Sequence, residues 1–193
     1  MNILERIIKI FVRDIMYDEK YLLDKNLLII KKCLDKVYSV DRSLFLKNKK
    51  DGVCERCLVF RFAHYLQENL KEYFVDCDYN ASFTLREDSQ GNPIITERNG
   101  KLIRGPNGIR QRKFVDIIVH KRLHEPFNDF ICFEVKKWNS KKKEFYKDVN
   151  NLKVLTSEYG YKYGFHLIFG KVRDETKVVV FKDGAILNDE LFL

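Results

Sequence analysis

The fold is decided by one short stretch, Phe130-Ile131-Cys132-Phe133-Glu134-Val135-Lys136, in which two charged residues interrupt an apolar run. In a β-strand, alternate side chains share a face. Glu134 and Lys136 therefore point to one side of the predicted strand, while Phe133 and Val135 point to the other. The sequence thus places a carboxylate and an ammonium group side by side on one surface of a predicted sheet.

A second apolar strand, predicted at 114–119, carries Asp116 between Val115 and Ile117. An ionised carboxylate in such a strand costs several kcal/mol unless it is paired or bound to a metal. If the strands of Asp116 and Glu134 are adjacent, two carboxylates and one ammonium group converge, which is typical of a magnesium-dependent phosphodiesterase. The alternative is a structural Asp116 and an ordinary surface pair between Glu134 and Lys136.

The metal chemistry assigns a role to each of these residues. Two carboxylates hold a hard cation, Mg²⁺ or Mn²⁺, which neutralises charge developing on a phosphate oxygen. We predict Asp116, Glu134 and Val135 as metal ligands. Lys136 then orients or deprotonates the attacking water, or stabilises the pentacovalent phosphorus. The predicted catalytic residues are Asp116, Glu134 and Lys136.

Glu55 is a candidate for a further metal ligand. A helix is predicted from 53 to 73, and Glu55 shares its apolar stripe with Leu58 and Phe62, so its side chain faces the sheet. The alternative is a first-turn glutamate stabilised by the helix dipole. Four secondary candidates could line the cleft or position the lysine, although each is more readily explained as structural: Asp78, Asn80, Asp148 and Lys153.

An Asp followed by Glu-x-Lys on successive strands, after a helix that carries Glu, resembles the PD-(D/E)XK, or restriction-endonuclease-like, nuclease superfamily. The resemblance covers roughly residues 53–170, with Val115 where the motif has proline. More closely, four segments resemble a group of mostly uncharacterised bacterial proteins in that superfamily: Val75 to Asn80, Asp116 to Arg122, Phe133 to Lys137, and Asp148 with Leu152-Lys153. The resemblance implies the fold and a nuclease activity, and it implies Glu55 as the metal ligand from the first core helix.

The order of the predicted elements indicates an α/β or α+β protein with a mixed sheet flanked by helices. Residues 1–45 form a predicted N-terminal helical section, with helices at 2–16 and around 27–38, and a hinge follows at 46–52. The nuclease-like domain spans 46–193. Its predicted elements after the helix at 53–73 are strands at 74–85, 114–119, 130–136, 162–169 and 177–181, and a helix at 141–159. The segment 86–111 is predicted to be mostly loop, with a small hairpin around Asn99-Gly100.

The chain of 193 residues has a formal net charge of +8, which favours a polyanionic partner. Six basic residues and no acid lie between 98 and 113, and six basic residues with one acid lie between 136 and 147. These windows flank the predicted site, although solvated loops explain each window equally well when it is taken alone. The predicted nucleic-acid contacts are Arg110, Arg112, Lys113, Lys137, Lys141 and Lys142.

The five cysteines form an odd set without secretory context, which favours free thiols, mostly buried. Cys54-Glu55-Arg56-Cys57 has the spacing of half a zinc site, but no second pair follows, so zinc is disfavoured. The apolar stretches are too short to cross a bilayer, so we expect a cytoplasmic protein without a membrane partner. The N-terminal helices are candidates for homodimerisation.

Together these features predict a divalent-metal-dependent endonuclease that hydrolyses phosphodiester bonds, with DNA favoured over RNA as the substrate. The alternative is a catalytically silent nuclease-fold module that binds nucleic acid or a partner protein. Intact Asp116, Glu134 and Lys136 argue for the enzyme.

Overall fold

The computed structural model describes residues 3–45, 54–80, 82–87, 90, 93–98, 101–104, 110–121 and 129–192. Its centre is a six-stranded mixed sheet. The strands follow one another across the sheet as β1 (Phe74–Tyr79), β6 (Val115–His120), β7 (Asp129–Lys137), β8 (Tyr163–Phe169), β9 (Lys177–Lys182) and β10 (Ala185–Phe192). This architecture confirms the predicted class of a mixed sheet flanked by helices.

The strands β7 and β8 are parallel, whereas every other neighbouring pair in this sheet is antiparallel. A parallel pair needs a crossover connection. The helix α3 (Lys142–Glu158) supplies it. The antiparallel pairing of β6 with β7 sets Ile117 opposite Phe133, which confirms that the strands of Asp116 and Glu134 are adjacent.

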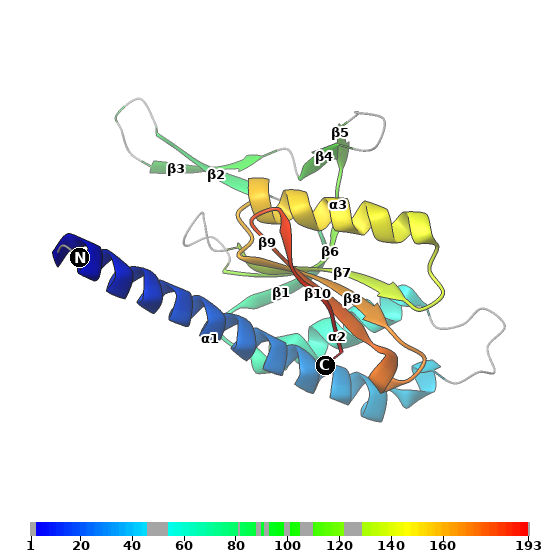
Figure 1. Cartoon of the computed structure of the whole chain (residues 1–193). Coiled ribbons are helices and arrows are strands. Elements are labelled where there is room, and N and C mark those ends of the chain that lie inside the picture. The colour runs from blue at the N-terminus through cyan, green and yellow to red at the C-terminus, as the bar shows by residue number, and fades with distance from the viewer. Residues whose placement is uncertain are drawn as a thin grey trace.

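Helices cover both faces of the sheet (Figure 1). On one face lie α1 (Ile3–Val40), the short 3-10 helix η1 (Arg42–Phe45) and α2 (Glu55–Asn69). Residues of α1 and α2 share one buried cluster with Phe133, and Phe62 of α2 meets the Phe133 ring edge-on at 5.5 Å between centroids. On the other face, Leu152 and Leu155 of α3 pack with Ile118 and Cys132 in a second cluster. The sheet is therefore buried on both sides.

Four short strands extend from this core and form two small hairpins. They are β2 (Ser82–Glu87) paired with β3 (Pro93–Arg98), and β4 (Leu102–Arg104) paired with β5 (Arg110–Arg112). A further 3-10 helix, η2 (Arg173–Glu175), joins β8 to β9. In Figure 1 both hairpins lie on the same side of the sheet as α3.

Lys101 anchors the second hairpin to the core. Its side chain is fully buried, and its ammonium group lies over the rings of Tyr79 and Tyr161, at 5.1 and 5.7 Å from their centroids. Its backbone N–H donates to Asn80 O at 3.0 Å, and its carbonyl accepts from the Lys113 N–H at 2.8 Å. The main chain at Lys113 is therefore fixed to the end of β1.

Several predicted boundaries are wrong. The two N-terminal helices are one continuous helix, because residues 17–26 contain no glycine or proline to break it. The strand predicted at 74–85 is divided between β1, which pairs with β6 in the central sheet, and β2, which pairs with β3 in a separate hairpin.

The segment predicted to be mostly loop contains β3, β4 and β5. The predicted turn at Asn99-Gly100 lies outside the described residues, and the strands on either side of it pair elsewhere, β3 with β2 and β4 with β5. The strand β10 was not predicted. The proposed hinge at 46–52 lies outside the described residues.

Three smaller predictions can also be compared with the structure. All five cysteines are free thiols, as predicted, but only Cys33 and Cys132 are buried, whereas Cys54 and Cys57 are exposed. None of the helices in the described parts of the chain combines the length and the hydrophobicity needed to span a bilayer.

The end of α1 is joined to the sheet by a buried hydrogen-bond network that can be tested. Tyr38 donates its hydroxyl to Gly170 O at 2.8 Å, and it lies 2.6 Å from Thr176 Oγ1. Tyr38→Phe should lower the free energy of unfolding by about 1–2 kcal/mol, because it leaves these groups without their partner. Urea titration measures the change. Tyr21→Phe is the matched control, since Tyr21 is 63% exposed, and equal effects of both variants would contradict the packing described.

Candidate active site

The candidate site lies where β6 and β7 meet the N-terminal parts of α2 and α3. Asp116 alternates with Val115 and Ile117 along β6, and Glu134 alternates with Phe133 along β7. Ile117 and Phe133 pack in the cluster shared with α1 and α2. Strand alternation therefore directs Asp116 and Glu134 to the α3 side of the sheet.

Asp116 is held by the neighbouring strand. Its Oδ2 accepts a hydrogen bond from the backbone N–H of Val135 at 2.8 Å. The Asp116 carboxylate thus takes the place of a backbone acceptor for this N–H, and the bond fixes it beside Glu134. Asp116 itself is half-buried.

Glu134 is completely buried, and its cation is Lys113. The Lys113 Nζ donates to Oε2 at 2.9 Å and lies 2.8 Å from Oε1. Oε1 nevertheless accepts no hydrogen bond of good geometry within the described residues. Burial raises the pKa of Glu134 well above its ordinary value, and Lys113 opposes this shift while Asp116 and Asp148 add to it.

Lys136 joins the two helical layers at the end of β7. Its Nζ lies 3.0 Å from Glu55 Oε1 on α2 and 3.2 Å from Asp148 Oδ2 on α3, and it donates to Val135 O at 2.9 Å. Burial lowers the pKa of Lys136, but Asp148, Asp116 and Glu55 outweigh it, so the net pKa lies above the ordinary value. The same balance raises the pKa of Lys113. Both lysines are therefore charged at neutral pH.

Asp148 and His166 are two further buried polar groups on the α3 side. His166 Nε2 lies 3.7 Å from Asp148 Oδ2, and His166 is opposite Glu134 in the parallel register. Burial raises the pKa of Asp148 to about 6, against the attraction of Lys136 and Lys113. Burial also lowers the pKa of His166 to about 4, and Lys136 lowers it further. His166 is thus neutral at neutral pH.

The site contains more carboxyl groups than ammonium groups. Four carboxylates, those of Glu55, Asp116, Glu134 and Asp148, face two ammonium groups. The upward pKa shifts of Glu134 and Asp148 arise first from burial and then from this excess, because Asp116 and Asp148 raise the pKa of Glu134, and Asp116 raises that of Asp148. An additional cation would therefore be favoured here.

The fit of a metal ion depends on Lys113. Among the described residues, no group of three or more His, Cys, Asp or Glu side chains is arranged so that it could hold a metal ion. The carboxylate oxygens are the donors that Mg²⁺ and Mn²⁺ prefer. Oε1 of Glu134 has an unused acceptor position, but Lys113 lies against both oxygens. The carboxylates of Asp116 and Glu134 would therefore suit a hard divalent cation only after Lys113 has left Glu134, and the carbonyl of Val135 is engaged by Lys136.

The structure brings several predicted residues together and separates others. Glu55 and Asp148 both reach the site through Lys136. Asp78 lies 45% exposed and forms an ion pair with Arg56 at 3.6 Å, and Asn80 accepts the Lys101 N–H through Oδ1 at 2.6 Å. These two serve the local fold. Lys153 is exposed on α3.

The predicted nucleic-acid contacts fall into two groups. Lys113 is mostly buried against Glu134, so it is part of the site in this state of the chain. Lys137 is half-buried at the end of β7. The others are exposed on β5 or at the start of α3: Arg110, Arg112, Lys141 and Lys142.

Three contacts escaped the sequence analysis. They are the ion pair of Lys113 with Glu134, the proximity of His166 to Asp148, and the hydrogen bond from Ser140 Oγ to Glu55 Oε2 at 3.4 Å. The sequence shows that Lys113 is basic, but it does not show that the Lys113 side chain points toward Glu134. Only the parallel pairing of β7 with β8, which the sequence does not specify, places His166 opposite Glu134.

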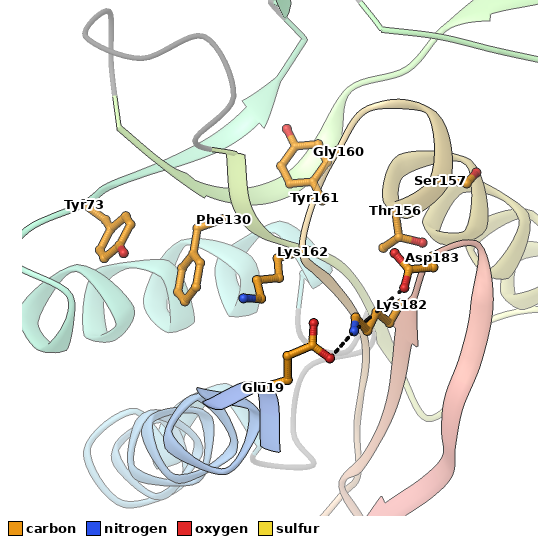
Figure 2. Close-up of a pocket in the computed structure, with 10 residues that line it drawn as sticks. All are labelled: Glu19, Tyr73, Phe130, Thr156, Ser157, Gly160, Tyr161, Lys162, Lys182 and Asp183. Atoms are coloured by element: carbon orange, nitrogen blue, oxygen red, sulfur yellow. Dashed lines mark hydrogen bonds and ion pairs between the residues drawn. The ribbon is translucent and has the colours of Figure 1, made fainter. Parts of the chain in front are cut away.

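A separate cavity of about 530 Å³ lies at the opposite ends of β7 and β8. Figure 2 shows Phe130 and Lys162 on one side of it and Glu19 joined to Lys182 on the other. The Lys182 Nζ lies 2.6 Å from Glu19 Oε2. None of the lining residues belongs to the candidate site, and its acids are already paired or exposed, so the cavity adds no group to the chemistry described above.

Comparison with known proteins gives no family assignment. No protein-family model matches the chain, and no curated protein or solved structure matches it either. The resemblance to PD-(D/E)XK nucleases therefore rests on the residues quoted above, and the function is argued from the site.

The opposite shifts of His166 and Asp148 predict an effect of pH on stability. The lowered pKa of His166 stabilises the fold above about pH 6.5, and this contribution is lost as the pH falls toward 4. The raised pKa of Asp148 acts in the opposite sense, because its contribution is present at low pH and is lost as the pH rises through about 6.

His166→Gln removes only the first contribution. Between pH 7 and pH 4.5, this variant should lose about 2 kcal/mol less stability than the wild type. Urea unfolding at the two pH values measures the difference. His64→Gln is the control, because the His64 side chain is 54% exposed. A parallel pH dependence in wild type and His166→Gln would contradict the buried, neutral state of His166.

Proposed function

We propose that the chain is a divalent-metal-dependent endonuclease that hydrolyses phosphodiester bonds in nucleic acid, with DNA as the first substrate to test. The observation that carries the proposal is the excess of carboxylates over ammonium groups around β6 and β7. Either protonation or a further cation relieves such an imbalance, and a divalent cation would do so without neutralising the carboxylates by protonation. A divalent ion, when bound, supplies charge neutralisation at a phosphate oxygen and activates a water molecule.

Asp116 and Glu134 are the residues that would hold this ion. Asp116 is already oriented by the Val135 N–H, so it loses little conformational freedom on binding. Glu134 becomes available when Lys113 leaves it. The two carboxylate oxygens of Glu55 are engaged by Lys136 and Ser140, which favours a role in positioning the lysine over direct ligation.

Lys136 acts as a positive charge in this proposal. Its raised pKa makes it a poor base at neutral pH, so of the roles considered above it supports orientation of the water and stabilisation of the developing phosphorane charge. Glu55 and Asp148 hold its ammonium group from two sides. Such a fixed charge stabilises the transition state without reorganisation.

The exposed basic residues supply contacts to the phosphate backbone. Arg110 and Arg112 lie on β5, directly before Lys113 in the chain, and Lys141 and Lys142 begin α3. Both elements adjoin the site through Lys113 and Asp148. A backbone bound across them would bring a phosphate toward Glu134, and the displaced Lys113 ammonium would then contact it.

One observation favours the alternative of a silent module that binds nucleic acid or a partner protein. Glu134, Glu55 and Asp148 already have lysine partners within the chain. A protein of this second class needs no metal. Calorimetric titration with Mn²⁺ distinguishes the two functions, because only the nuclease should have a stoichiometric site that Asp116→Asn removes.

Cleavage assays test the enzyme directly. With Mg²⁺ or Mn²⁺ and plasmid, single-stranded DNA or RNA, Asp116→Asn and Lys136→Gln should each reduce cleavage by about a hundredfold or more. Asp116→Asn keeps an acceptor for the Val135 N–H, so the fold should survive. Asp183→Asn, at an 82% exposed side chain, is the control. Unreduced cleavage by Asp116→Asn would refute the assigned site.

Lys113 allows a separate prediction about metal affinity. Because its ammonium competes for Glu134, Lys113→Gln should bind Mn²⁺ more tightly, on the order of tenfold, while cleaving more slowly. Lys113→Arg should bind Mn²⁺ more weakly, since a guanidinium group holds a carboxylate in a bidentate pair.

The control for this comparison is Lys147→Gln, which removes one exposed charge near Asp148 without touching Glu134. Calorimetry on the four proteins measures the affinities. Identical affinities in all of them would contradict competition between Lys113 and the metal.

A further inference from the structure

The first turn of α2 carries two cysteines that the proposed function does not use. Cys54 is the N-cap residue of α2, Cys57 follows three residues later, and both are exposed. The Cys57 N–H donates to Cys54 O at 2.9 Å, and a hydrogen bond also joins the two side chains. The two thiols are therefore neighbours on an accessible surface.

The five thiols of the chain differ in exposure. Cys54 and Cys57 are exposed at the start of α2, whereas Cys33 and Cys132 are buried and Cys77 is half-buried. Cys54 is the N-cap residue, and the backbone N–H groups at a helix N-terminus stabilise a thiolate, which is the reactive form. The first attack is therefore assigned to Cys54.

The spacing of the pair suits a covalent bond. Side chains three residues apart in a helical turn have Cβ atoms about 5–6 Å apart. A disulfide joins Cα atoms about 4.4–6.8 Å apart and needs Cβ atoms somewhat closer than an open turn provides. The backbone of Cys54 at the N-cap is extended and not yet helical, so the adjustment that closes the bond falls on a residue outside the helical hydrogen-bonding pattern.

We propose that Cys54 and Cys57 form a reversible intramolecular disulfide by exchange with a low-molecular-weight disulfide. The Cys54 thiolate attacks one sulfur of that disulfide, which forms a mixed disulfide and releases one thiolate. Cys57, after losing its proton to solvent, attacks Cys54 Sγ and releases the second thiolate. The protein loses two electrons and two protons, and the small disulfide is reduced to two thiols.

The position of Glu55 connects this pair to the candidate site. Glu55 lies between the two cysteines in sequence, and its carboxylate is 3.0 Å from Lys136 Nζ. The disulfide would close a covalent ring that contains Glu55. This connection to catalysis rests on the proposed function, whereas the thiol chemistry does not.

Thiol mapping of the full-length reduced chain tests the proposal. The protein is incubated with oxidised glutathione, quenched with acid, alkylated and mapped by mass spectrometry. We expect Cys54 and Cys57 to become protected together without a retained glutathione adduct, while Cys33, Cys77 and Cys132 are alkylated. Dithiothreitol should restore both thiols. The readout involves neither metal nor nucleic acid, so its failure is distinguishable from failure of the nuclease proposal.

Two serine variants separate the attacking from the resolving thiol. Cys57→Ser should retain a glutathione adduct on Cys54. Cys54→Ser should react with oxidised glutathione at about a tenth of the wild-type rate or more slowly still. Serine is a favoured N-cap residue, so Cys54→Ser should fold. Cys77→Ser is the matched control and should behave as the wild type. A persistent adduct in the wild type, protection at Cys77 instead, or equal rates in the two variants would overturn the proposal.

Discussion

Glu134 is a carboxylate with no solvent contact, placed between the central sheet and α3. An ion in such a position costs several kcal/mol unless charges of opposite sign surround it. This cost explains why the Lys113 side chain turns inward, although its neighbours Arg110 and Arg112 remain in solvent. The segment that joins β5 to β6 is thereby drawn against the sheet, and the carboxylates of Asp116 and Asp148 are left with less compensation than they need.

Lys136 connects the buried charges of the site to the helical layers on both faces of the sheet. Glu55 belongs to the helical layer on one face of the sheet and Asp148 to the layer on the other, yet both bind one ammonium group at the end of β7. The sheet ends there, so side chains from both faces can meet around its edge. The two layers are otherwise separated by the buried clusters around Phe133 and Ile118. The candidate site is therefore the place where the two halves of the fold contact each other through charge.

The sequence predicted the parts of the fold that depend on local periodicity. The strands around Asp116 and Glu134, the helix before them and the helix after them were found from apolar spacing alone, because burial on both faces leaves a strong pattern. The strand β2 was merged with β1, and β3 to β5 were missed, because their segment is rich in glycine, proline and asparagine, which are typical of loops. The continuous α1 was divided in two, because its middle turns are polar and only the absence of a helix breaker reveals them.

The sequence predicted which residues belong to the candidate site, but not which of them form ion pairs with one another. Strand alternation identified Asp116, Glu134 and Lys136, and the helical stripe identified Glu55. The partner of Glu134 could not be found this way, because Lys113 reaches it from a connecting segment whose direction is set by tertiary contacts. His166 was likewise hidden, since its position depends on the order of strands in the sheet.

The buried Lys101 has a consequence for the speed of ion exchange at Glu134. Its carbonyl holds the Lys113 N–H, and its own ammonium is enclosed by two tyrosine rings, so the main chain beside the site is fixed. Lys113 can therefore leave Glu134 by rotation about its side-chain bonds, without opening of the β4–β5 hairpin. Side-chain rotations are faster by orders of magnitude than loop or domain movements. In the proposed function, entry of a cation would then be limited by its own dehydration and by the strength of one ion pair, and not by unfolding of the surrounding chain.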